Sequence, residues 1–217
     1  MSYVAWGLLC EGGSDRAYFE ALLPRVLDEL CLRHGRRPVT IPNAPAISLG
    51  RKGREIEAVA KEICENRDCF HLAFIHADTG GRGVAQSLSQ RGLAYCQRAT
   101  ALCDFNCLHC VMIAPCHELE AWALADPDAL ASALGYRGDV TKLGAPANAT
   151  AAERLTDPKA ALNQVAQGVR KRRGHDDYAG LLTVVGRTQS LDALRASMSF
   201  RAFEADLLQG LASLRIV

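Results

Sequence analysis

The sequence predicts an α/β fold in which helices sandwich a mostly parallel sheet, followed by a helical C-terminal extension. Three short apolar runs, at residues 4–10, 70–77 and 108–114, have the length and composition of buried parallel strands. Segments with helical periodicity lie between these runs, and alternation of strand and helix is typical of α/β domains. Beyond residue 156 the pattern is helical, so we expect the last third of the chain to pack on the sheet as a cap.

The first half of the chain supplies the alternating elements. Ser14 is a suitable N-cap for a helix to about residue 33, where apolar side chains recur every fourth position and Pro24 should bend or interrupt the helix. The segment 39–49 contains two prolines and is expected to be a loop with a short strand. Helices are expected at residues 54–66 and 84–102, on either side of the second strand.

The second half begins with the third strand and becomes helical. A short helix at residues 118–124 and one or two turns at 128–134 follow the strand. Residues 136–156 are rich in glycine, alanine, proline and asparagine and are expected to form a long surface loop. The remaining expected helices are 158–169, 191–196 and 200–214, the last with Ser199 as N-cap. We therefore expect a catalytic α/β domain at 1–135 and a loop and helical portion at 136–217 on the same core.

Composition excludes some classes of protein. The length of 217 residues fits one large domain or a domain with a small appendage. A net charge of +1 argues against a generally basic nucleic-acid binder. We see neither a signal peptide nor an apolar stretch long enough to span a membrane, so a cytoplasmic protein is expected. The nine cysteines are then expected to be reduced thiols.

Acidic residues follow all three apolar runs. They are Glu11 after the first, Asp78 after the second, and Glu118 and Glu120 after the third. Parallel strands bring their carboxyl ends to one edge of a sheet, where ligands bind. Carboxylates gathered there repel one another unless a cation neutralises them, and oxygen ligands select Mg2+ or Mn2+. The sequence therefore predicts a metal-dependent site that acts on phosphate esters.

Each acid also has a structural explanation. Asp15 follows Glu11 in a glycine turn that opens a helix, where an acid simply favours the helix dipole. Asp78 could close its strand with an Asx-type turn, and His76, two residues earlier, could be a packed histidine. On one helix Glu118 and Glu120 point in different directions, so only one would face the site unless the helix begins after Glu118.

Several motifs resemble those of TOPRIM domains, the topoisomerase–primase catalytic fold. The segment Leu8-Leu9-Cys10-Glu11-Gly12-Gly13-Ser14-Asp15 is similar to the first motif of that family, and Phe74-Ile75-His76-Ala77-Asp78 to its Asp-x-Asp strand, with His76 in place of the first aspartate. The stretch from Glu118 to Pro127 resembles small stand-alone TOPRIM-like proteins encoded near ATPases in bacterial phage-defence loci. So do Asp157-Pro158-Lys159-Ala160-Ala161-Leu162 and Ser199-Phe200-Arg201-Ala202-Phe203.

The resemblance implies a TOPRIM- or Rossmann-like fold and a Mg2+-dependent nuclease related to the overcoming-lysogenization-defect type. It implies Glu11 as general acid/base or metal ligand, and Asp15 as a residue that orients Glu11 or holds a second cation. It also implies Asp78 as a metal ligand, with Glu118 or Glu120 completing the site. Nucleic acid, most simply DNA, is the implied substrate, with an ATPase partner in antiviral defence. His76 argues against a two-metal form, because imidazole is a poor Mg2+ ligand.

Hydrolysis is favoured over strand passage, because none of the five tyrosines has a context that marks a nucleophile. The tyrosines are Tyr3, Tyr18, Tyr95, Tyr136 and Tyr178. A phosphotransfer enzyme is a further alternative, but Gly12-Gly13-Ser14 lacks the Gly-Lys-Ser/Thr ending of a phosphate loop. A non-catalytic regulatory or docking subunit of an ATPase-containing complex is the alternative of a different class.

Two other groups of residues could bind ligands. The basic run Arg170, Lys171, Arg172 and Arg173 is a candidate for contact with a nucleic-acid backbone, or a solvated helix end. Cysteines at 103, 107, 110 and 116, with His117, are numerous enough for Zn2+, or they fill small apolar sites.

Overall fold

A four-stranded parallel sheet forms the centre of the protein. The structure, a computed structural model, describes residues 2–10, 12–50, 55–80, 93–170 and 177–217. The strand order is β4-β2-β5-β6, and every neighbouring pair is parallel. The bounds are Trp6–Cys10 for β2, Ile47–Gly50 for β4, Leu72–His76 for β5 and Cys110–Ile113 for β6. A separate parallel pair joins β1 (Ser2–Tyr3) to β3 (Val39–Thr40).

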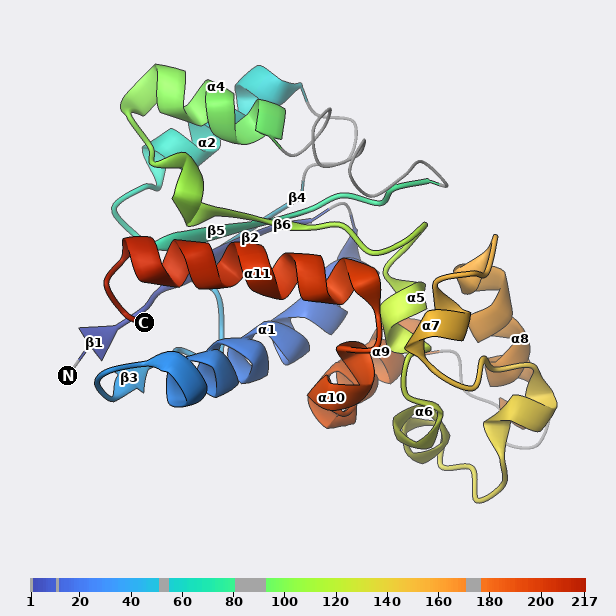
Figure 1. Cartoon of the computed structure of the whole chain (residues 1–217). Coiled ribbons are helices and arrows are strands. Elements are labelled where there is room, and N and C mark those ends of the chain that lie inside the picture. The colour runs from blue at the N-terminus through green and yellow to red at the C-terminus, as the bar shows by residue number, and fades with distance from the viewer. Residues whose placement is uncertain (1, 11, 51–54, 81–92, 171–176) are drawn as a thin grey trace.

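Helices cover both faces of the sheet (Figure 1). On one face lie α1 (Gly13–His34) and α11 (Met198–Ser213), and on the other lie α2 (Ile56–Glu65) and α4 (Leu93–Cys103). Side chains alternate along the strands, so Phe74 packs into the core under α1 and α11, whereas Ile75 packs into the smaller core under α2 and α4. The predicted α/β architecture with a mostly parallel, helix-flanked sheet is therefore confirmed.

Short helices gather beyond the carboxyl ends of the strands (Figure 1). A 3-10 turn at Cys107–His109 lies instead at the amino end of β6. The gathered elements are α5 (Glu120–Ala123), α6 (Pro127–Ala133), α7 (Ala149–Ala152), α8 (Pro158–Arg170), α9 (Tyr178–Thr188) and α10 (Leu191–Leu194), with a 3-10 turn at Val140–Leu143. Their apolar side chains join the core beneath α1 and α11. The C-terminal portion thus shares one continuous core with the sheet, and α11 returns the chain to the sheet itself.

Some local predictions were wrong. Helix α1 begins at Gly13, so its N-cap is Gly12 and not Ser14. The side chain of Asp15 closes this helix start, because Asp15 Oδ2 accepts a hydrogen bond from Gly12 N at 2.8 Å. The N-cap of α11 is Ser197, whose hydroxyl accepts from Phe200 N. Of the two effects expected of Pro24, an interruption of the helix does not occur, because Pro24 lies inside α1.

Two longer segments also differ from expectation. The expected loop at 136–156 contains α7 and a 3-10 turn, both capped by side chains, those of Asn148 and Asp139. Helix α9 was not predicted at all. Its segment is amphipathic but short of charges, and four residues separate its start from the basic run.

The expectation that all cysteines are free thiols is wrong for one pair. Cys64, near the end of α2, and Cys103, at the end of α4, form a disulfide. This bond joins the two helices that cover the same face of the sheet.

Candidate functional site

The loops that follow β5 and β6 are hydrogen-bonded to each other. Ala77 N donates to Ile113 O at 3.0 Å, Gly80 N donates to His117 O at 3.1 Å, and His117 N donates to the Thr79 hydroxyl at 2.7 Å. Because β2, β5 and β6 are adjacent and parallel, α1 begins at this same edge. The segments that carry Asp15, Asp78 and Glu118 therefore meet at the carboxyl edge of the sheet.

His76 lies between two of the predicted site carboxylates. Its Nδ1 is 3.4 Å from Asp15 Oδ2 and its Nε2 is 3.2 Å from Asp78 Oδ1. The imidazole is fully buried and packs against Phe19, with 4.8 Å between the ring centroids. His76 faces α1 because it is two residues from Phe74 on the same side of β5.

These contacts set the charge of the buried group. Burial disfavours the imidazolium, but the contacts with Asp15 and Asp78 outweigh burial and raise the pKa of His76 to about 9. Burial likewise opposes ionisation of Asp15, yet His76 and the Gly12 amide bring the pKa of Asp15 below its ordinary value. At neutral pH His76 is therefore an internal cation beside Asp15 and Asp78 rather than a packed neutral ring.

Both glutamates after β6 belong to the same cluster. Helix α5 begins at Glu120, so Glu118 lies in the preceding turn and the two need not point in different directions. Glu120 is almost fully buried, and burial raises its pKa, with the neighbouring charge of Glu118 adding to the rise. The Oε2 atom of Glu118 is buried and accepts no hydrogen bond from the described part of the chain.

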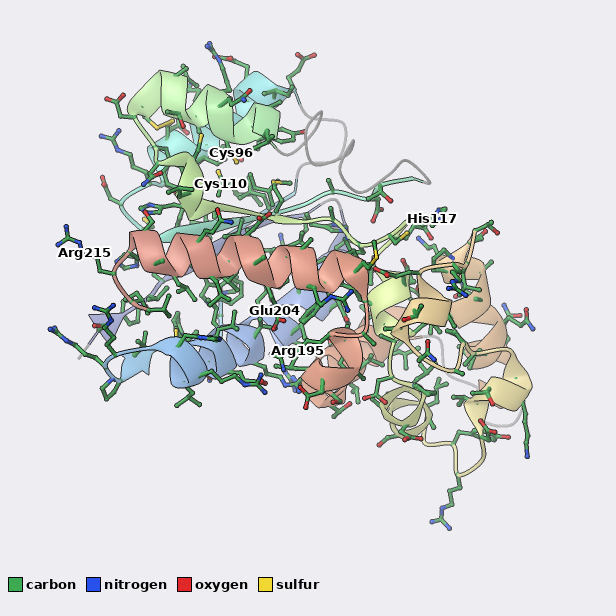
Figure 2. The ribbon with its side chains drawn as sticks, in the orientation of Figure 1. Cys96, Cys110, His117, Arg195, Glu204 and Arg215 are labelled. Carbon is green, nitrogen blue, oxygen red and sulfur yellow. A yellow bond between two sulfur atoms is a disulfide. The ribbon has the colours of Figure 1, made fainter. Side chains whose placement is uncertain are left out.

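The turn that carries Glu118 has unusual backbone geometry. His117 has a φ of 64°, a left-handed conformation that is uncommon for a residue with a side chain. Such residues cluster at functional sites, where surrounding structure holds them in place. Figure 2 shows His117 beyond the strand ends, on the side where the short helices gather.

Tyr178 is a site residue that sequence reasoning missed. Its hydroxyl donates a hydrogen bond to Glu120 Oε1 at 2.6 Å. Burial and the charges of Glu120, Glu118 and Asp15 all raise the pKa of Tyr178, so its hydroxyl stays protonated. Tyr178 is the first residue of the unpredicted helix α9, and nothing in its sequence neighbourhood pairs it with residue 120.

Part of the predicted site lies outside the described residues. These are Glu11, the first expected metal ligand, and Lys171, Arg172 and Arg173 of the basic run. Arg170 is the last residue of α8. Among the described residues, no three His, Cys, Asp or Glu side chains are grouped so that they could hold a metal ion.

The cysteines do not form the alternative zinc site in the described structure. Cys103 is consumed by the disulfide with Cys64. Cys110 begins β6 and Cys116 follows its carboxyl end, and six residues of extended chain span about 20 Å. Cys96 and Cys110 instead face each other between α4 and β6 (Figure 2), and this contact and burial raise the pKa of Cys110.

Comparisons with known proteins identify no family for this chain: no family model, no curated protein and no solved structure matches it. Among the helices of the described ranges, none has the length and apolar character needed to cross a membrane.

Proposed function

We propose that this protein is a TOPRIM-like, Mg2+- or Mn2+-dependent nuclease. One observation carries the proposal: acids that follow three adjacent parallel strands, Asp15, Asp78, Glu118 and Glu120, converge on one edge of the sheet. Ligand sites in open α/β sheets lie at this edge. The resemblance of the sequence to TOPRIM motifs supplies nucleic acid as the substrate and an ATPase partner in antiviral defence.

Carboxylate oxygens are the donors that a hard divalent cation prefers. Glu118 Oε2 is a buried carboxylate oxygen without a hydrogen bond from the described residues, and such an atom is costly to leave without a positive partner. Asp78 is partly exposed at the rim, where it could meet a cation and a substrate phosphate. Together with Glu11, these residues would hold the ion, which would supply an activated water and stabilisation of the leaving oxygen.

The residues have distinct proposed roles. Glu11 exchanges the proton of the attacking water, Asp15 fixes the helix start beside it, and Glu118 and Glu120 complete the ligand set. His76 already supplies one positive charge to this edge, between Asp15 and Asp78. This arrangement favours one divalent cation over two, since part of the negative charge is neutralised internally.

A cleavage assay tests the proposal. Plasmid, linear DNA and RNA are incubated with the full chain and Mg2+ or Mn2+, using wild type, Glu11→Gln, Asp78→Asn and a matched control. The control is Asp68→Asn, an exposed aspartate before the amino end of β5, remote from the site. We expect metal-dependent cleavage in wild type and the control and a loss of at least about a hundredfold in both site variants. Cleavage that survives both site substitutions would remove the proposed site from the reaction.

A non-catalytic docking or regulatory subunit is the second candidate. It is favoured by His76, because an imidazolium paired with Asp15 and Asp78 satisfies two of the acids without any cation. Under this alternative wild type and all variants are inactive on every substrate. Calorimetry then shows no binding of Mn2+ to the wild-type protein.

A further inference from the structure

Tyr178 comes from the C-terminal portion of the chain, far in sequence from the acid it contacts. Its hydroxyl bonds Glu120 Oε1 at 2.6 Å, across 58 positions. Glu120 is almost entirely buried, so this hydrogen bond is shielded from bulk water. The bond therefore selects one orientation of Glu120 and occupies one of its two oxygens.

Helix α9, whose first residue is Tyr178, packs against α1. Arg25 donates to Gly186 O and Gln189 O, both at 2.7 Å. Gly186 lies so close to α1 that a Cβ atom there would be 2.7 Å from Tyr18 O. At the start of α9, Asp177 Oδ1 accepts from Gly180 N at 2.7 Å. Since the first turn of α1 carries Asp15, one rigid helix pair positions both Asp15 and Tyr178.

The hydroxyl is suited to donating rather than to attacking. Its partner is a carboxylate oxygen, Oε1 of Glu120, at 2.6 Å. An ionised carboxylate only accepts hydrogen bonds, so the phenol is the donor in this pair. The observed bond to Glu120 is the donating arrangement.

We propose that Tyr178 is a positioning residue of the carboxylate site: its hydroxyl holds Oε1 of Glu120, so that the other oxygen of Glu120 and Oε2 of Glu118 are presented to a divalent cation. The inference rests on the proposed metal-dependent function and adds a residue from the C-terminal portion to it. Hydrogen bonds to ligating carboxylates orient them, and loss of such a partner typically weakens metal binding by about 10- to 100-fold.

The test measures Mn2+ binding to the full chain by calorimetry and electron paramagnetic resonance, without any nuclease substrate. Tyr178→Phe removes only the hydroxyl, and Tyr136→Phe is the matched control, a half-buried tyrosine packed on the same core. We expect Mn2+ affinity to fall by about tenfold or more in Tyr178→Phe and to be unchanged in the control. Circular dichroism establishes that each variant is folded.

A spectroscopic readout separates positioning from a general structural role. Cation binding at Glu120 should change the hydrogen bond of Tyr178, so Mg2+ should perturb the tyrosine ultraviolet difference spectrum of wild type and of Tyr136→Phe, but not of Tyr178→Phe. Wild type alone provides this signal even if Tyr178→Phe does not fold. Two outcomes would overturn the role of Tyr178: equal Mn2+ affinity in Tyr178→Phe and wild type, or Mg2+ binding to wild type without a tyrosine signal. Either outcome would leave the nuclease proposal standing. Absence of cation binding in wild type would overturn both.

Discussion

Trp122 Nε1 donates a hydrogen bond to the hydroxyl of Ser199 at 2.8 Å, across 77 positions of the chain. Ser199 in turn donates to Glu153 Oε1 at 2.5 Å. This buried chain joins α5, which begins with the site residue Glu120, to the start of α11 on the sheet. Two segments far apart in the sequence, around residues 118–127 and 199–203, therefore meet through these side chains.

Replacing Ser199 should destabilise the whole fold. Ser199→Ala leaves the buried indole N–H of Trp122 without its acceptor, which costs about 1–3 kcal/mol. Urea unfolding followed by tryptophan fluorescence measures the change. The control is Ser132→Ala on the exposed surface of α6, where an effect within about 0.5 kcal/mol is expected. Equal stabilities of the two variants would contradict the importance of this bond.

Glu153 should make stability depend on pH in the acid range. Burial raises the pKa of Glu153, but hydrogen bonds from Ser197, Ser199 and Met198 N outweigh it, and the pKa lies below its ordinary value. The ionised carboxylate therefore stabilises the fold fully above the unfolded-chain pKa of about 4.3. That contribution is lost as pH falls through the lower folded-state pKa.

Glu153→Gln should accordingly be less stable than wild type at pH 7, with a gap that narrows below about pH 4. Urea unfolding at a series of pH values measures both quantities. Glu65→Gln, at an exposed glutamate of α2, serves as the control and should follow the wild-type profile. A gap that stays constant through the acid range would show that the charge of Glu153 is not what stabilises the start of α11.

His76 should make stability depend on pH in the alkaline range. Its pKa is raised to about 9 in the folded protein, above the unfolded value of about 6.5. The contribution of the imidazolium is thus fully present below about pH 6.5 and is lost as pH rises through about 9. At neutral pH the free energy of unfolding of His76→Gln should be about 3 kcal/mol lower than that of wild type, because buried Asp15 loses its positive partner.

Two measurements check the behaviour of His76. Urea unfolding from neutral to alkaline pH should show that the free energy of unfolding of wild type declines. This decline should be smaller in His76→Gln. It should be retained in the control His34→Gln, which changes an exposed histidine at the end of α1. Nitrogen NMR of the imidazole should report a doubly protonated ring at pH 8. A His76 resonance that titrates near pH 6.5 would contradict the internal cation.

The Cys64–Cys103 disulfide should stabilise the α2–α4 layer. It closes a loop with a sequence separation of 39, for which a contribution of about 2–4 kcal/mol is typical. In urea unfolding, the double variant Cys64→Ser/Cys103→Ser should have a free energy of unfolding lower than wild type by that amount. The control Cys69→Ser, at an exposed free cysteine, should change the free energy of unfolding little. Alkylation of all nine cysteines in the unreduced, denatured protein would show that the bond is absent.

Local patterns were enough to predict much of the architecture. Buried parallel strands are almost uninterrupted apolar runs, so β2, β5 and β6 are visible in the sequence, and so are the acids that follow them. The regular apolar spacing from Tyr18 to Leu30 likewise predicts α1. The capping residues were placed less well, because several polar residues near a helix start compete to satisfy the same amides.

The sequence by itself determined the α/β class, the three neighbouring strand ends and the acids placed after them, because these follow from local apolar runs and from the parallel pairing they favour. Only the tertiary structure decided that His76 is a cation between Asp15 and Asp78, that Tyr178 bonds Glu120, and that Trp122 meets Ser199. Such contacts depend on distances between side chains far apart in the chain, and no local pattern encodes which of many polar residues will be buried against each other.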